Sequence, residues 1–268
     1  MLRDITLGQY YQTDSILHRM DCRVKLVATL AFIISLFVVD NLWGYLLAAA
    51  FLTVCIRLSK VPFKFMVKGM KAILFLMLFA VVFNLFLTPG TPVVTFWKLK
   101  ITEEGISMAV KMAVRLTMLI IGSSLMTLTT TPNHLTDGLE SLLNPLKKLK
   151  VPVHEVAMMM SIALRFIPIL MEETDKIMKA QIARGADFES GNLIQKAKAM
   201  VPLLVPLFIA AFRRANDLAM AMEARCYRGG EGRTKMKPLV YGKRDYIAYA
   251  VLACYLTAAV VIGRVLPL

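Results

Sequence analysis

Residues 153–184 read VHEVAMMMSIALRFIPILMEETDKIMKAQIAR, and the interpretation of the whole chain starts from this stretch. Its first half is almost entirely apolar, whereas its second half mixes apolar and charged residues with the period of an α-helix. Gly185, a residue type that commonly ends helices, follows directly. The pattern predicts one helix of roughly 50 Å, which suits a strut lying along or under a membrane face.

The same pattern returns at residues 192–225, NLIQKAKAMVPLLVPLFIAAFRRANDLAMAMEAR. An apolar centre again precedes a mixed charged stretch, and an arginine between small residues again stands at the end. The first tip is Ala183-Arg184-Gly185 and the second is Ala224-Arg225-Cys226, so the two arginines are 41 residues apart. The repeat predicts two similar long helices, each with one arginine at its carboxyl end.

Two interpretations of these arginines are open. A single arginine at a helix carboxyl end is most simply explained by its attraction to the helix dipole. Two matched cases instead favour a paired docking device, because a guanidinium stays charged and grips a carboxylate or backbone carbonyl groups with two parallel hydrogen bonds. Small neighbours would let each tip enter a groove. Two tips need two grooves, so the expected partner is a dimer or a pair of related subunits.

The composition indicates a membrane protein. Of the 268 residues 57% are hydrophobic, whereas about 45–50% is usual in soluble domains. There are 32 Lys and Arg against 18 Asp and Glu, a formal net charge of +14. In a membrane protein this excess usually reflects cationic loops at the cytoplasmic leaflet. The four cysteines lie far apart and predict neither a disulfide framework nor a metal site.

Five apolar stretches predict membrane spans, namely residues 24–39, 42–56, 72–88, 106–130 and 246–266. The polar pair Asp40-Asn41 predicts a tight turn between the first two. The 57–71 connection holds five Lys or Arg and no acid, and the segments after the fourth span and before the fifth are also basic. Because basic loops tend to stay inside, we expect a plasma-membrane protein with a cytoplasmic N-terminus and an external C-terminus.

The segment 132–245 is too long for a linker and too poor in glycine for a disordered region. We expect a short helix from Pro132 to near Pro145 and then the two long helices. The predicted fold class is an all-α polytopic membrane protein, with about five transmembrane helices and a cytoplasmic-side module of long helices. The expected parts are residues 1–131 with spans one to four, residues 132–244 with the module, and residues 245–268 with the last span.

The sequence contains no P-loop, no HExxH and no GxSxG motif, so we expect no catalytic residue, no metal site and no cofactor bound by this chain. A secondary transporter or other membrane carrier is the alternative, but it would require inverted repeats and carboxylates at mid-span. A membrane-bound enzyme lacks any catalytic constellation. A membrane-anchored nucleic-acid binder is disfavoured because 12 acidic residues interrupt the basic ones in 132–245.

Arg115 and Lys111 are the basic residues that lie well inside a predicted span. The simplest expectation is that Lys111 extends outward to the interface and that Arg115 packs in the protein interior. The alternative for Arg115 is a polar contact with another membrane subunit.

The chain resembles the transmembrane T component of energy-coupling factor (ECF) transporters, the EcfT/CbiQ-like family, along nearly its whole length. The paired arginine tips are the most specific shared feature. Cys22 and Cys226 stand where the family often has proline and glycine. The stretches that carry the resemblance are Gly8-Gln9-Tyr10, residues 15–25 (SILHRMDCRVK), 123–132 (SSLMTLTTTP), 152–155 (PVHE), 163–168 (ALRFIP), 183–188 (ARGADF) and 223–229 (EARCYRG).

The resemblance implies a non-catalytic coupling and scaffold subunit of an ATP-driven vitamin or metal-ion uptake transporter. Its long helices would cross as coupling helices, and each tip would enter a groove of one of two ATPase subunits, which would bind ATP and Mg. Motion of the ATPases would topple a membrane-embedded, substrate-binding S component and release the substrate inward. Pro168, Pro202 and Pro206 would bend the long helices.

The resemblance also suggests where the S component binds. An apolar face with Met158, Met159 and Met160 would suit a contact that must form and release, because methionine adapts to different surfaces. Ordinary packing within the helix bundle explains the same methionines equally well. Arg115 is the other candidate contact.

Overall fold

The computed structural model describes residues 10–71, 73–89, 91–96, 99–188, 192–230, 232 and 236–265. The chain divides into two compact units: a core unit of Gly8–Gly138 with Leu239–Leu268, and a long-helix unit built from Leu139–Pro238. A few residues named in the sequence analysis lie outside the described residues, namely Gly8, Gln9, Ala72 and Leu266.

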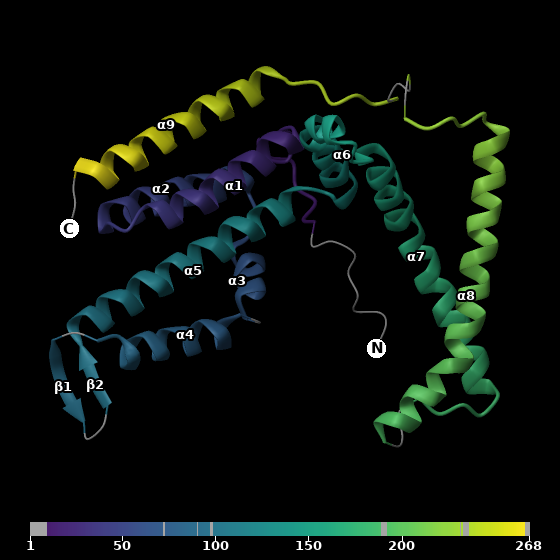
Figure 1. Ribbon diagram of the computed structural model, residues 1–268, viewed down its shortest axis with the longest axis horizontal. Coiled ribbons are helices and arrows are strands. Elements are labelled where there is room, and N and C mark those ends of the chain that lie inside the picture. Colours follow the sequence, from purple (N-terminus) through teal and green to yellow (C-terminus); the bar gives the residue numbers. More distant parts are fainter. Residues whose placement is uncertain are drawn as a thin grey trace. The chain divides into compact units, whose positions relative to one another are not determined.

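The core unit contains α1 (Cys22–Val38), α2 (Leu42–Ser59), α3 (Phe63–Lys71), α4 (Leu74–Leu87), α5 (Glu103–Thr129) and α9 (Lys243–Val265). Both α1 and α2 contact α5 and α9, so these four helices lie side by side (Figure 1). Their shared interface forms the hydrophobic core, with Phe32, Leu36, Tyr45, Leu125 and Leu252 buried in it. Helix α4 packs on α5 outside this group.

Side-chain caps mark the beginnings of α1 and α5. The Asp21 carboxylate accepts a hydrogen bond from the backbone N–H of Arg23 (2.9 Å), and the Thr102 hydroxyl accepts one from Gly105 (3.1 Å). Such caps satisfy N–H groups that a helix leaves unpaired in its first turn. Asp245, in the first turn of α9, accepts a bond from the Asp21 N–H at 2.9 Å. This contact joins the beginnings of α1 and α9, which are far apart in the sequence.

The five predicted spans coincide with α1, α2, α4, α5 and α9 to within three residues at each end. The predicted 57–71 connection contains an unpredicted helix, α3, which is amphipathic and buries Met66 completely. The segment between the third and fourth spans contains an antiparallel hairpin of β1 (Pro92–Phe96) and β2 (Leu99–Thr102). The fold class is all-α as predicted, with this small hairpin added in the described part of the chain.

Among the described residues, length and hydropathy select a partly different set of five helices as able to cross a membrane. Helices α2, α5 and α9 belong to it, and so do α7 (Val153–Ala183) and α8 (Leu193–Ala224) of the long-helix unit. Helices α1 and α4, with 17 and 14 residues, are shorter than the 18 residues this set requires. The number of candidate spanning helices therefore agrees with the prediction, but only three of these five helices are among the predicted spans.

Helix α6 (Pro132–Leu143) begins in the core unit and ends in the long-helix unit, where the 3-10 turn η2 (Asn144–Leu149) leads to α7. The helices predicted at 153–184 and 192–225 are confirmed to within one residue. Helix α7 is about 46 Å long by its residue count. Pro168 lies inside α7, and Pro202 and Pro206 lie inside α8, so the bends expected at these positions stay predictions.

The two long helices leave most of their apolar surface uncovered within the chain. In their apolar stretches only 11% of the residues of α7 and 6% of those of α8 are buried, compared with 33% in α5. Phe208 and Phe212, which lie one turn apart on α8, are 64% and 57% exposed. An apolar surface of this extent indicates contact with lipid or with another protein.

Candidate functional site

The carboxyl end of α7 adopts a Schellman motif at the first predicted tip. The N–H of Gly185 donates to the carbonyl of Ile182 (2.9 Å), and the N–H of Ala186 donates to the carbonyl of Gln181 (3.0 Å). Gly185 has a φ of 88°, in the left-handed region that this motif requires and that glycine adopts without steric cost. Arg184 is the last residue before this reversal of the backbone.

The carboxyl end of α8 repeats the motif at the second tip. The N–H of Cys226 donates to the carbonyl of Glu223 (2.8 Å), and the N–H of Tyr227 donates to that of Met222 (3.0 Å). Cys226 takes the left-handed position, with a φ of 55°. A side chain with a Cβ is unfavourable there. The second tip therefore keeps the backbone geometry of the first although it lacks the glycine.

Both arginines are available to a partner. All six tip residues, Ala183, Arg184, Gly185, Ala224, Arg225 and Cys226, are exposed. Neither tip guanidinium forms an ion pair or a side-chain hydrogen bond with any residue that the structure describes. Arg214, in the middle of α8, differs from them because it binds Glu173 of α7 at 2.8 Å. The tips thus present unpaired, fixed charges, whereas the charge in the middle of the helix holds the unit together.

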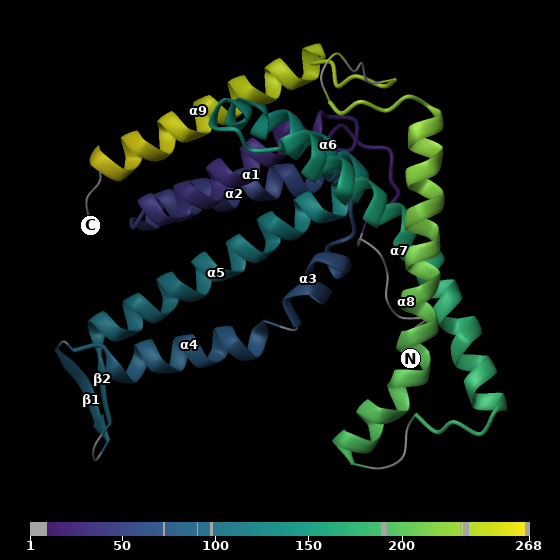
Figure 2. The ribbon, with the colours of Figure 1, turned by 45° about the vertical axis from the view of Figure 1, so that its right-hand side comes forward.

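The contacts between α7 and α8 place the two tips on opposite sides of a crossing (Figure 2). Glu173 of α7 meets Arg214 of α8, while Gln181, further along α7, donates to the carbonyl of Pro202, earlier in α8. The helices therefore run antiparallel through their contact. Arg184 lies only roughly 5 Å past the last of these contacts on α7, whereas Arg225 lies roughly 17 Å past the last one on α8, at 1.5 Å per residue.

The base of α7 holds the segment that follows the second tip. His154 Nδ1 lies 2.8 Å from Glu140 Oε1 of α6, and the ring is mostly buried. A Cβ added at Gly230 would lie 2.5 Å from His154 Cδ2, so the backbone after the tip packs directly on this ring. Sequence reasoning gave His154 no role. The pair Gly229-Gly230 directly after the tip was the signal that a side chain approaches the backbone there.

The predicted S-component contacts fall in different units. Met159 and Met160 are exposed on α7, and Met158 beside them is half-buried. Arg115 belongs to the core unit. Its guanidinium binds the Asp40 carboxylate at 2.5 Å and donates to the Tyr45 hydroxyl at 3.1 Å. The side chain of Arg115 is thus engaged within this chain, at the turn between α1 and α2.

The described residues contain no group of three or more His, Cys, Asp or Glu side chains that could hold a metal ion. The described residues do present two exposed cationic tips and two apolar helix faces. This combination defines a class, an integral membrane subunit built to contact other proteins.

Comparison with known proteins identifies the family. The family model described as cobalt transport protein, CbiQ, matches residues 13–236. The chain is 56% identical over 267 residues to the energy-coupling factor transporter transmembrane protein EcfT of Clostridium kluyveri, which covers 99% of this chain and 98% of that one. It is 54% identical to the EcfT of Ruminiclostridium cellulolyticum over 257 residues, 96% of each chain.

The EcfT of Bacillus subtilis is 48% identical over 260 residues, which cover 96% of this chain and 98% of that protein. The chain belongs to the EcfT/CbiQ family of transporter transmembrane components. The resemblance found in the sequence is confirmed.

The two tips allow a paired test of the backbone geometry. Cys226→Gly should stabilise the protein by about 1 kcal/mol, because it removes the cost of a Cβ in the left-handed region. Gly185→Cys should destabilise the protein by a similar free energy of unfolding. No atom lies within 4 Å of an added Cβ at Gly185, so its cost is conformational and not a clash. Thermal unfolding of the purified wild-type protein and both variants in the same detergent measures the two changes in stability. Equal melting temperatures for all three proteins would contradict the argument.

Proposed function

We propose that this protein is the transmembrane coupling and scaffold subunit of an ATP-driven ECF-type uptake transporter, which links a pair of ATPase subunits to a membrane-embedded, substrate-binding S component. The observation that carries the proposal is the matched pair of exposed arginine tips. Two helices end in the same hydrogen-bond pattern, and each presents one unpaired guanidinium. The relatives named as ECF transporter transmembrane proteins support the same assignment.

Each tip suits a groove in a soluble subunit. The guanidinium of Arg184 or Arg225 would form paired hydrogen bonds with a carboxylate or with backbone carbonyls. The neighbours Ala183, Gly185 and Ala224 are small, so they would not block the approach. Because the tips lie on opposite sides of the helix crossing, each would meet its own groove. An ATPase pair of two identical or two related subunits offers such a pair of grooves.

The crossing of α7 and α8 would transmit motion from the arginine tips to the membrane-embedded part of the transporter. Helices α7 and α8 are joined by the contacts Glu173–Arg214 and Gln181–Pro202. When ATP binding and hydrolysis move the ATPases, the tips would move with them and change the angle between the helices. Pro168, Pro202 and Pro206, which each remove a backbone hydrogen-bond donor inside a helix, would make bending easier. The S component would then topple and release a vitamin or a metal ion inward.

The exposed apolar faces of the long helices are the proposed seat of the S component. Met158, Met159 and Met160 of α7 are candidates, because methionine side chains repack readily when a contact forms and breaks. On α8 the apolar face continues through Phe208 and Phe212. Arg115 is a weaker candidate than the sequence suggested, since its guanidinium already binds Asp40 and Tyr45.

The chain itself would be non-catalytic. ATP and Mg would bind to the partner ATPases, and no cofactor would bind here. The protein would be a multi-pass plasma-membrane protein whose N-terminus and arginine tips face the cytoplasm and whose C-terminus is external. Support for this orientation comes from the many Lys and Arg residues of the 57–71 segment and of the long-helix region, because basic loops tend to stay on the cytoplasmic side.

Removing both tip charges should uncouple the transporter. Arg184→Ala or Arg225→Ala should weaken ATPase co-purification and substrate uptake, because truncating one partner of a buried charge pair costs about 2–5 kcal/mol. The double variant should lower ATPase co-purification and substrate uptake more than either single variant does. Arg→Lys should restore function only in part, because an ammonium cannot form the paired contact.

Arg213→Ala is the matched control, since Arg213 is an exposed arginine of the same helix away from the tip. It should retain both ATPase binding and uptake. If the double alanine variant kept both at wild-type levels, the arginines would be ordinary helix-end charges and the paired-tip proposal would be wrong.

The orientation can be tested with a native cysteine. Cys226 is exposed at the second tip. In a variant that keeps only Cys226, a membrane-impermeant maleimide should label permeabilised cells and not intact ones. A variant with Pro89→Cys as its only cysteine should be labelled in intact cells, because Pro89 is an exposed residue at the end of α4, on the predicted outer side. Labelling of Cys226 in intact cells would contradict the proposed orientation.

The purified chain alone should hydrolyse no ATP above a detergent blank, since the sequence lacks a phosphate-binding loop. Adding the two ATPase subunits and Mg should produce hydrolysis in the assembled complex. ATP turnover by the isolated chain that survives a second purification step would contradict the non-catalytic assignment.

A further inference from the structure

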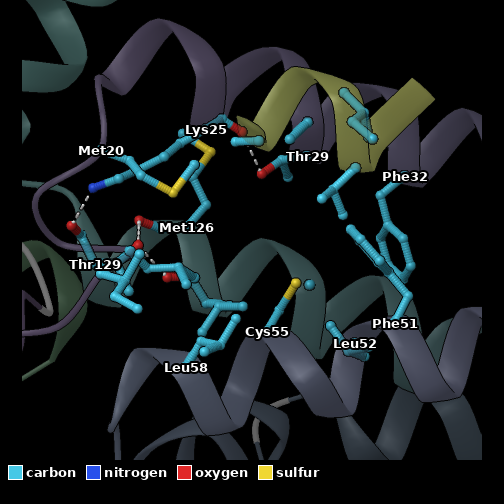
Figure 3. Close-up of a pocket in the computed structure, with 18 of the residues that line it drawn as sticks. Met20, Lys25, Thr29, Phe32, Phe51, Leu52, Cys55, Leu58, Met126 and Thr129 are labelled. Carbon is cyan, nitrogen blue, oxygen red and sulfur yellow. Dashed lines mark hydrogen bonds between the residues drawn. The ribbon is translucent and has the colours of Figure 1, made fainter. Parts of the chain in front are cut away.

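The core unit encloses a cavity of about 240 Å³ between α1, α2, α5, α9 and the segment that precedes α1 (Figure 3). Phe32 and Phe51 line it, and both rings also pack against Tyr255. Met20, Met126 and other apolar side chains line the remainder. Neither the arginine tips nor the apolar faces of α7 and α8 take part in this cavity, so the proposed function does not account for it.

Apart from Arg244, the charged and hydroxyl side chains of the cavity wall are already paired within the chain. The Lys25 ammonium donates to the carbonyls of Thr129 (2.8 Å) and His18 (3.4 Å). The Thr29 hydroxyl donates to the Lys25 carbonyl, and the Thr129 hydroxyl donates to the Leu125 carbonyl, both at 2.8 Å. A polar solute would therefore find few hydrogen-bond partners inside, whereas an apolar chain would lose none. The interior fits a hydrocarbon occupant.

An exposed cation forms part of the lining of this apolar cavity. Arg244 lines the cavity from the first turn of α9, is exposed, and forms no ion pair among the described residues. The neighbouring carboxylate of Asp245 accepts bonds from the N–H groups of Asp21 (2.9 Å) and Gly242 (2.8 Å), so it is committed to the backbone. Arg244 also marks the point where the polar connector gives way to the apolar helix α9. Such a position lies at the level of lipid headgroups.

We propose that this cavity is a binding site for an anionic phospholipid, with one acyl chain inside the four-helix group and the phosphate on Arg244. A guanidinium binds a phosphate with paired hydrogen bonds, and the anionic lipids of the cytoplasmic leaflet are attracted by basic residues near the membrane surface. Lys243, exposed beside Arg244, adds to this attraction without lining the cavity.

The size of the cavity separates a lipid chain from other occupants. Pockets for soluble ligands usually measure about 300–1,000 Å³, and this one is smaller. A single acyl chain is narrow enough and can extend from the cavity mouth into the bilayer.

The test uses phosphatidylglycerol that carries a photoactivatable diazirine on one acyl chain, in vesicles with the reconstituted full-length protein. Irradiation followed by peptide mapping should place the label on cavity residues of α1, α5 and α9. Arg244→Ala should lower the labelling about fivefold, while Lys243→Ala, with the same loss of charge one residue away, should change it less than about twofold. Arg244→Lys should be labelled to a level between those of the wild-type protein and Arg244→Ala.

A second variant fills the cavity without touching the charge. Ala248 lines the wall on α9, so Ala248→Phe should abolish the label on the cavity residues while Arg244 is intact. Unlabelled phosphatidylglycerol should compete with the probe, and phosphatidylcholine should compete at least about fivefold less well.

The proposal is overturned if Arg244→Ala and Lys243→Ala label alike, if the label maps outside the cavity, or if phosphatidylcholine competes as well as phosphatidylglycerol. Equal competition by oleate would assign the site to a free fatty acid and overturn the phospholipid. None of these results bears on the arginine tips, so the lipid site and the coupling function can fail separately.

Discussion

A helix that ends in exposed chain must satisfy its last carbonyl groups, and α7 and α8 do so in the same way. In each, two N–H groups turn back onto carbonyls of the last turn, and one residue takes a left-handed backbone conformation. This reversal directs the chain away and leaves an arginine at the end of a rigid helix. A flexible tip would lose much of the free energy of any contact in ordering itself. The proposed coupling therefore depends on these few backbone hydrogen bonds.

The second constraint is the apolar surface that the chain does not cover. The core unit buries residues from four helices around Phe32 and Leu36, so it has an interior of its own. The long-helix unit has no comparable core in its described residues: in α8, Leu203 is buried, whereas Phe208 and Phe212 are exposed. Its stability must therefore come in part from lipid or from other subunits. A subunit of this kind is complete only within its assembly.

The sequence predicted the elements whose signals are local. Both long helices and their ends were found because a glycine, a charged tip and a helical period lie within a few residues of each other. The left-handed conformation of Cys226 was not found, because cysteine is not a residue that favours it. The hairpin and α3 are not predicted, because both are much shorter than an apolar run of membrane length.

The contacts that were missed join residues distant in the sequence. Arg115 meets Asp40 and Tyr45 only because α5 packs beside the turn between α1 and α2. His154 meets Glu140 because the short turn η2 joins α6 to α7, and it meets the backbone of Gly230 because the chain returns to the beginning of α7 after α8. Composition and periodicity carry no information about contacts between residues that are distant in the sequence. The same holds for the cavity, whose walls come from four helices and the segment before the first of them.

The asymmetry of the crossing has a mechanical consequence within the proposed function. Arg184 lies close to the region where α7 and α8 touch, whereas Arg225 lies about three times farther from it along its own helix. If both ATPases moved by the same amount, the short arm would turn its helix through a larger angle and the long arm would move with less rotation. The segment behind Arg225 is also held, by His154 against Gly230 and by Glu140 against His154. The first tip would then act mainly to rotate the pair of helices, and the second, whose following segment is held by His154, would act to anchor it.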